Sequence, residues 1–72
     1  MKKATYNVSK IASNIKKRRL AKDLSRDELA KQAKVNYNTI IKIESGANKN
    51  PTIQTLIGIA RVLEATVEEM IV

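Results

Sequence analysis

The sequence contains no cysteine and no histidine among its 72 residues. The absence of cysteine excludes disulfides and thiolate metal sites, and zinc sites usually need at least one of these two residue types. A histidine general base is excluded as well. Glu68 and Glu69 are adjacent, and adjacent side chains on a helix do not converge on one site. We therefore expect no metal, no cofactor and no enzymatic activity.

Proline, glycine and aromatic residues are also scarce. The chain has one proline (Pro51), two glycines (Gly46 and Gly58) and 3% aromatic residues, all of them tyrosine. Because proline and glycine interrupt helices and both are rare here, the sequence favours helices connected by short turns. The apolar-polar alternation typical of strands is missing. Because 43% of the residues are hydrophobic, we expect one small all-α domain with a thin aliphatic core.

Positive charge is abundant and unevenly placed. The net charge is +7, and residues 1–26 hold nine basic side chains against a single acidic one, Asp23. This balance indicates a polyanionic partner: nucleic acid, an anionic membrane surface or an acidic protein. No apolar run reaches the roughly 18–20 residues needed to cross a bilayer. Because Met1-Lys2-Lys3 is not followed by the apolar stretch of a signal peptide, we expect a cytoplasmic protein that does not bind membranes.

Capping residues divide the chain into five expected helices. Residues 1–8 are expected to form a flexible basic arm, and residues 9–72 the folded domain. N-caps favour Ser, Thr, Asp and Asn, and a Glu three positions after Ser or Thr completes a capping box. The helices are expected to start at Ser9, Ser25, Asn36, Thr52 and Thr66, with capping boxes at Ser25–Glu28 and Thr66–Glu69.

Apolar spacing predicts which side chains form the core. The expected inward positions are Ile11, Ala12, Ile15, Leu20, Leu29, Ala30, Ala33, Ile40, Ile43, Ile53, Leu56, Ile57, Ala60 and Leu63. Gly58 within a helix indicates close packing, since glycine there costs about 1 kcal/mol relative to alanine. Two short helices flank a turn at residues 34–36, which is the outline of a helix-turn-helix, a motif whose second helix enters the major groove of DNA.

The spaced pattern resembles the Cro/CI-type (Xre) helix-turn-helix regulators over roughly residues 9–71. The matching residues include Leu24-Ser25, Asp27–Ala30, Val35-Asn36, Thr39-Ile40, Ile43-Glu44, Gly46, Pro51-Thr52, Leu56, Ile59-Ala60, Leu63 and Thr66–Glu69. The resemblance implies a compact five-helix bundle like the lambda-repressor DNA-binding domain. This chain departs from the family's pattern at Lys34 and Glu64, where glycine is usual, and at Arg26, where glutamine is frequent.

The second helix of the motif supplies the expected DNA contacts. Tyr37, Asn38, Ile41 and Lys42 are expected to face base edges, because Asn pairs with adenine, Lys donates to guanine, and apolar groups touch the thymine methyl. The alternative is an exposed, solvated helix face, and Lys42 could instead touch phosphate. Phosphate contacts are expected near the helix starts and in the loop that follows, from Arg26, Asn36, Thr39, Asn48, Lys49 and Asn50. We expect Lys16 and Lys17 to be merely solubilising.

Two further groups have an expected structural role. The resemblance implies an ion pair between Arg19 and Glu44, either buried or at the surface. Met70, Ile71 and Val72 end the chain on apolar residues. They either complete the core or form a dimer seam with exposed faces of the last two helices.

Taken together, these features predict sequence-specific binding to double-stranded DNA by a small homodimeric transcriptional regulator. We expect a repressor that occludes promoter DNA at an inverted repeat, with half-sites about 34 Å apart. The alternative is an antitoxin or other protein-interaction module, with a toxin as partner and autoregulatory DNA binding. A cationic peptide lying on membranes fits the basic N-terminal segment but not the remaining helices.

Overall fold

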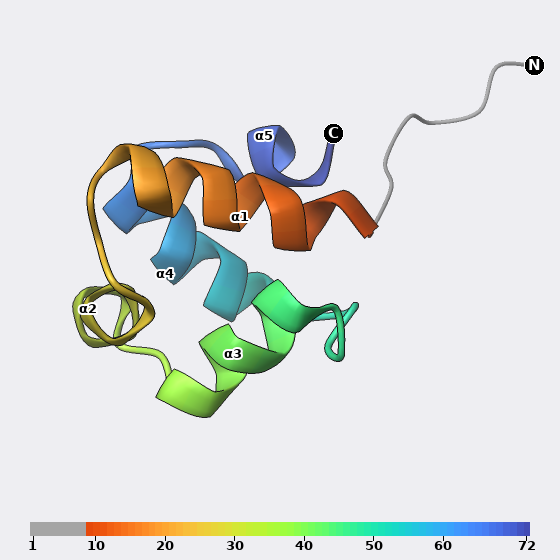
Figure 1. Ribbon diagram of the computed structural model, residues 1–72. Coiled ribbons are helices and arrows are strands. Elements are labelled where there is room, and N and C mark those ends of the chain that lie inside the picture. Colours follow the sequence, from red (N-terminus) through yellow and green to blue (C-terminus); the bar gives the residue numbers. More distant parts are fainter. Residues whose placement is uncertain (1–8) are drawn as a thin grey trace, which may run out of the picture.

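The computed structural model describes residues 9–72, which form five helices joined by short turns (Figure 1). The helices are α1 (Ser9–Ala21), α2 (Arg26–Ala33), α3 (Tyr37–Ser45), α4 (Ile53–Leu63) and α5 (Val67–Ile71). No strand occurs within residues 9–72. The all-α, five-helix prediction is therefore confirmed, whereas the predicted arm at residues 1–8 lies outside the described residues.

Both predicted capping boxes are present. The Glu28 backbone N–H donates to Ser25 Oγ at 3.0 Å, and the Ser25 N–H donates to the Glu28 carboxylate at 2.8 Å. Thr66 and Glu69 repeat this exchange at 2.8 and 3.0 Å. The backbone N–H of each cap residue lowers the pKa of its glutamate, because the hydrogen bond favours the charged carboxylate.

The other helix starts depend on single caps. The Asn36 side chain accepts from the Asn38 N–H at 2.8 Å, and Thr52 Oγ1 accepts from the Thr55 N–H at 3.1 Å. At the first helix the prediction is off by one position, since Ser9 is the first residue of α1 rather than its N-cap.

Three helices end on residues with left-handed backbone conformations. Gly46 ends α3 at φ 85°, as predicted. Lys34 ends α2 at φ 58° and Glu64 ends α4 at φ 56°. At Lys34 and Glu64 the family's usual glycine is replaced by a residue with a Cβ, which makes the left-handed conformation unfavourable by roughly 1–2 kcal/mol.

One hydrophobic core is formed by residues from all five helices. In this core, α1 packs against α3 and α5, and α2 packs against α3 and α4. The buried apolar side chains are Ile11, Ile15, Leu29, Ala30, Ala33, Ile40, Ile43, Leu56, Ile59, Ala60, Leu63 and Met70. Figure 1 shows α2 and α3 together on the side of the molecule away from α5.

Three apolar residues predicted to face inward are exposed instead. Leu20 is 58% exposed, because the four-residue step from Ile15 leads to Arg19, which occupies the inward position. On α4, Ile53 is 63% and Ile57 is 53% exposed. These two isoleucines are four residues apart and therefore lie on one outer face of the helix.

The burial of Met70 shows that one of the three residues predicted for the dimer seam does not belong to it. The Met70 side chain is fully buried, so it belongs to the core and is not available for a seam between two subunits. Ile71 is half-buried and Val72 is exposed. The end of α5 is also fastened to α1, since the Asn14 side-chain amide donates to the carbonyls of Met70 at 2.8 Å and Val72 at 3.2 Å.

Gly58 of α4 lies close against α2, which confirms the predicted close packing at this residue. A Cβ at this position would lie 2.8 Å from the backbone oxygen of Ala33. Such a separation is too short for a real contact, so the spacing of the two helices requires a residue without a side chain here.

Candidate DNA interface

The turn between α2 and α3 sets the position of the second helix of the motif. The N–H of Lys34 donates to the Lys31 carbonyl at 3.2 Å, and the N–H of Val35 donates to the Ala30 carbonyl at 2.9 Å. The left-handed Lys34 redirects the chain between these bonds. As a result, α3 leaves the turn with Ile40 and Ile43 buried against the core and its opposite side outward.

The residues predicted to read bases lie on α3, and most of them are exposed. Tyr37 is 45% exposed, and Asn38 and Lys42 are also exposed. Ile41 differs, because it is half-buried between the outer face and the core. Tyr37 and Asn38 occupy the first turn of the helix.

The residues predicted to contact phosphate from helix starts lie at the N-termini of α2 and α3. Arg26 is exposed at the first position of α2. Asn36 and Thr39 belong to the cap and first turn of α3, where Thr39 is half-buried. Helix N-termini carry partial positive charge and unpaired N–H groups, which favour anions such as phosphate.

The loop after α3 is ordered by hydrogen bonds to the chain itself. The Asn48 N–H donates to the Lys42 carbonyl at 2.9 Å, and Asn48 Oδ1 accepts from the Asn50 N–H at 3.0 Å. Asn48 is therefore half-buried and shapes the loop, whereas Lys49 and Asn50 are exposed. Neither Lys42 nor Lys49 takes part in the ion pairs formed within residues 9–72.

The ion pair implied by the resemblance is present and buried. Arg19 Nε donates to Glu44 Oε2 at 2.7 Å, and a second guanidinium nitrogen donates to Oε1 at 3.0 Å. The remaining Nη of Arg19 donates to the Leu24 carbonyl at 2.7 Å. The two side chains are only 8% and 3% exposed. The hydrogen bond to Glu44 raises the pKa of Arg19, so the guanidinium stays charged and joins the end of α3 to α1.

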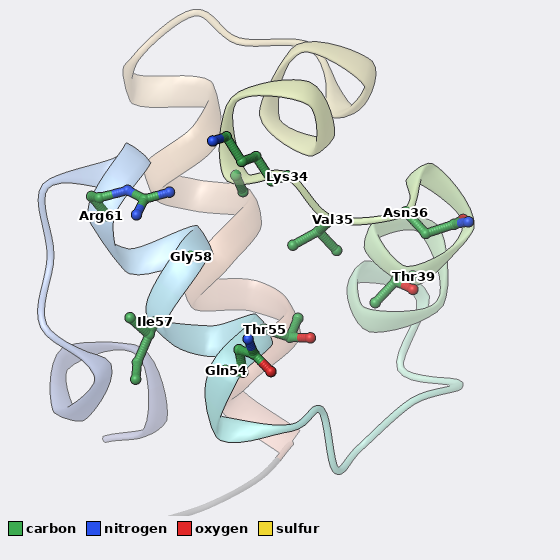
Figure 2. Close-up of a pocket in the computed structure, with 10 residues that line it drawn as sticks. Lys34, Val35, Asn36, Thr39, Gln54, Thr55, Ile57, Gly58 and Arg61 are labelled. Carbon is green, nitrogen blue, oxygen red and sulfur yellow. The ribbon is translucent and has the colours of Figure 1, made fainter.

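A hollow that the sequence did not predict lies beside the start of α3. It lies between the α2–α3 turn and α4 and measures about 550 Å³ (Figure 2). Gln54 and Arg61 of α4 line it, and neither was assigned a role from the sequence. The four-residue spacing of Ile53, Ile57 and Arg61 would have placed these three on one face of α4.

Comparison with known proteins identifies the motif. The family model described as Helix-turn-helix (HTH_3) matches residues 15–70. The chain belongs to the helix-turn-helix family. This match confirms the predicted membership among DNA-binding regulators of the Cro/CI (Xre) type. A search of curated proteins gave no match.

Solved structures of helix-turn-helix proteins share the fold. The N-terminal DNA-binding domain of SinR from Bacillus subtilis is 35% identical over 83% of this chain and 87% of that chain, with a TM-score of 0.82. The restriction-modification controller protein C.Esp1396I is 34% identical over 82% and 75% of the two chains, with a TM-score of 0.75. A transcriptional regulator from Vibrio cholerae is 36% identical over 88% of this chain but only 35% of its own, with a TM-score of 0.79.

Within residues 9–72, no group of His, Cys, Asp or Glu side chains is placed to hold a metal ion. None of the helices in that range is both long and apolar enough to span a membrane.

Proposed function

We propose that this helix-turn-helix protein recognises a specific double-stranded DNA sequence by inserting α3 into the major groove. The observation that supports this most directly is the outer face of α3, where Tyr37, Asn38 and Lys42 are exposed while the opposite face is fully buried. SinR, a protein of the same fold and 35% identity, has been solved in complex with DNA. A helix held in this way presents side chains at the depth of the base edges.

The contacts divide into two kinds. Tyr37, Asn38 and Lys42 meet base edges, and the half-buried Ile41 offers a short apolar contact to a thymine methyl. Phosphates are contacted from both sides of α3, by Arg26, Asn36 and Thr39 at the helix starts and by Lys49 and Asn50 in the loop. Asn48 shapes the loop through its side-chain oxygen, which accepts from Asn50, and its side-chain amide donates to a phosphate.

The active form is proposed to be a homodimer that reads an inverted repeat and represses transcription by occluding a promoter. Apolar side chains are available for the seam, namely the exposed Ile53 and Ile57 on α4 and the half-buried Ile71 and exposed Val72 at the end of α5. Burying exposed isoleucine side chains contributes about 1.5–3 kcal/mol each relative to leaving them in water. A two-fold dimer would present two copies of α3 to half-sites one helical turn apart.

The division of contacts is tested by DNA-binding titrations at several salt concentrations, on a site obtained by in vitro selection. Asn38→Ala is expected to reduce discrimination between the selected and a scrambled site by about 5- to 150-fold, since a bidentate base contact is worth about 1–3 kcal/mol. Lys49→Ala should weaken both sites alike and lower the salt slope by about 1.

The matched control is Lys16→Ala, which removes a charge from the exposed surface of α1. It should leave discrimination unchanged. Equal affinity of the unmodified protein for the selected and the scrambled site would contradict sequence-specific recognition. Identical behaviour of Asn38→Ala and Lys49→Ala would contradict the assigned roles.

The exposed Ile53 and Ile57 also support a second candidate, an antitoxin or similar module that covers a toxin or another protein. SinR has been solved in a complex with the SinI protein. Light scattering coupled to size-exclusion chromatography separates the two functions. A stable dimer of the isolated chain supports the first, and a monomer that forms a stoichiometric complex with the product of a neighbouring gene supports the second.

A further inference from the structure

The hollow between the α2–α3 turn and α4 has the size of a small-molecule site. Its volume of about 550 Å³ falls within the roughly 300–1,000 Å³ typical of ligand pockets. Gly58, where α4 packs against α2, forms part of the lining. Figure 2 shows Val35 pointing from the turn toward α4, so the hollow has an apolar wall.

Two cationic side chains converge at one end of the hollow. Lys34 extends from the turn and Arg61 from α4, and Figure 2 shows their charged ends pointing toward one another. The residues that line the hollow include no aspartate or glutamate. Lys34 and Arg61 also take no part in the ion pairs formed within residues 9–72. Two like charges brought together without an acid between them attract an anion.

The opposite end offers neutral hydrogen-bonding groups. Thr39 of α3 and Thr55 of α4 lie on opposite sides of this end, and Gln54 is next to Thr55 (Figure 2). The Thr52 hydroxyl donates to Thr55 Oγ1 at 3.0 Å, which leaves the Thr55 proton free to donate. These groups can hydrogen-bond to a ligand whose anionic end lies between the two cations, but the anion itself is held at the other end.

The backbone at Lys34 has a positive φ, as it does at Asp23 and Glu64. Lys34 holds the left-handed conformation, φ 58° and ψ 45°, although a residue with a Cβ is unfavourable there. A glycine would form the same turn without this strain but would contribute no charge. The residue that carries this strain is one of the two converging cations.

We propose that this hollow binds a small organic anion, with its carboxylate or phosphate group between Lys34 and Arg61 and its body over Gly58 against Val35. An arginine fork binds either group in a bidentate manner, and lysine adds a point charge. Occupancy would also alter DNA binding, because Thr39 lines the hollow and is a proposed phosphate contact; this second step rests on the proposed function.

The experiment is a titration of the isotope-labelled protein followed by amide NMR shifts, without DNA. The probes are phenyl phosphate, 3-phenylpropionate and inorganic phosphate, each compared with sodium chloride at the same ionic strength. The expected result is saturable shifts confined to the α2–α3 turn and the exposed face of α4 for at least one organic probe. Comparing phenyl phosphate with 3-phenylpropionate distinguishes a phosphate from a carboxylate ligand, and inorganic phosphate shows whether the organic body contributes.

Three variants make the result specific. Lys34→Gly, which keeps the turn, and Arg61→Gln should each weaken binding of the responding probe by about tenfold or more, since a hydrogen bond to a charged group is lost. The control Lys16→Gln removes an equal charge from α1 and should change the affinity by less than twofold. Shifts that do not saturate, or that weaken equally in Lys16→Gln and Lys34→Gly, would overturn the proposal.

The DNA step is measured separately, by repeating the DNA titration with the responding probe present. A change in DNA affinity that is lost in Lys34→Gly supports the coupling, and an unchanged affinity overturns it. Because the NMR titration uses protein alone, failure of the anion site and failure of DNA recognition are distinguishable.

Discussion

Removing the charge of Glu44 should destabilise this domain more than any exposed substitution. Glu44→Gln keeps the shape of the side chain but leaves the Arg19 guanidinium without its carboxylate. Arg19 is only 6% exposed, so water cannot replace the lost partner. The two hydrogen bonds that join the pair, at 2.7 and 3.0 Å, both end on the carboxylate that is changed.

The expected magnitude follows from burial. Stranding one charge of a buried pair costs about 3–5 kcal/mol. A domain of 72 residues has a free energy of unfolding of about 4–11 kcal/mol at typical values per residue. Glu44→Gln should therefore remove from about a quarter to all of the stability. By contrast, the exposed pair of Lys22 and Glu64 should contribute under about 1 kcal/mol.

The assay is urea unfolding followed by circular dichroism, extrapolated to water. Lys22→Gln serves as the matched control. In a double-mutant cycle, Arg19→Met combined with Glu44→Gln should cost less than the sum of the single changes, because the second change removes the stranded charge. If Glu44→Gln destabilised the protein no more than Lys22→Gln, the argument that this buried pair fastens α3 to α1 would be wrong.

Three further predictions concern the backbone and the caps. Lys34→Gly should raise the free energy of unfolding by about 1 kcal/mol by relieving the left-handed strain, which corresponds to roughly 4–8 °C in Tm; an unchanged or lower Tm contradicts this. Gly58→Ala gains about 1 kcal/mol of helix propensity but forces a Cβ against the Ala33 backbone, which costs about 1–3 kcal/mol. The free energy of unfolding measured in urea should therefore fall. A higher urea midpoint than that of the unmodified protein would show that α2 and α4 separate freely. Because the pKa values of Glu28 and Glu69 are lowered, their stabilisation is present above the ordinary glutamate pKa of about 4.3 and is lost as pH falls through the lowered values; unfolding midpoints measured from pH 6 to pH 2 should fall less steeply for the variant with both residues changed to Gln, and equal slopes would contradict the assignment.

Helix boundaries were the most predictable part of this fold, because capping is local. Ser25, Asn36, Thr52 and Thr66 all cap helices as expected, each through a hydrogen bond within three residues along the chain. Such bonds depend only on neighbouring residues, which the sequence shows directly.

The side chains that face the core were less predictable, since contacts between distant parts of the chain decide which side chains are buried. At the end of α1 the apolar Leu20 was expected to face inward, and the structure shows a reversal of residue types, since Leu20 is exposed and its neighbour Arg19 is buried. The reversal depends on Glu44, which is 25 residues away and whose carboxylate makes a buried arginine acceptable. Along α4, the stripe of isoleucines is wider than the core can cover, so Ile53 and Ile57 remain outside.

The candidate site was predictable in its residues but not in its shape. The exposed positions Tyr37, Asn38 and Lys42 followed from the helical period of α3. The half-burial of Ile41 and the structural role of Asn48 did not, because both depend on how the following loop folds back onto Lys42. The hollow near Arg61 requires the spacing of α2 and α4, which no local pattern contains.

The helix proposed to enter the groove is held at both ends and along one side. Asn36 caps its start, Gly46 ends it, and Glu44 joins its last turn to the buried Arg19. Asn36, Gly46 and Glu44 fix the position of α3 through its ends and its buried side. The outer side chains of α3 are therefore not needed to hold the helix in place. Substitutions at Tyr37, Asn38 or Lys42 should therefore change which bases are preferred while leaving the position of the helix unchanged. Substitutions at Arg19 or Glu44 should have the opposite effect, lowering affinity for every site through the stability of the fold.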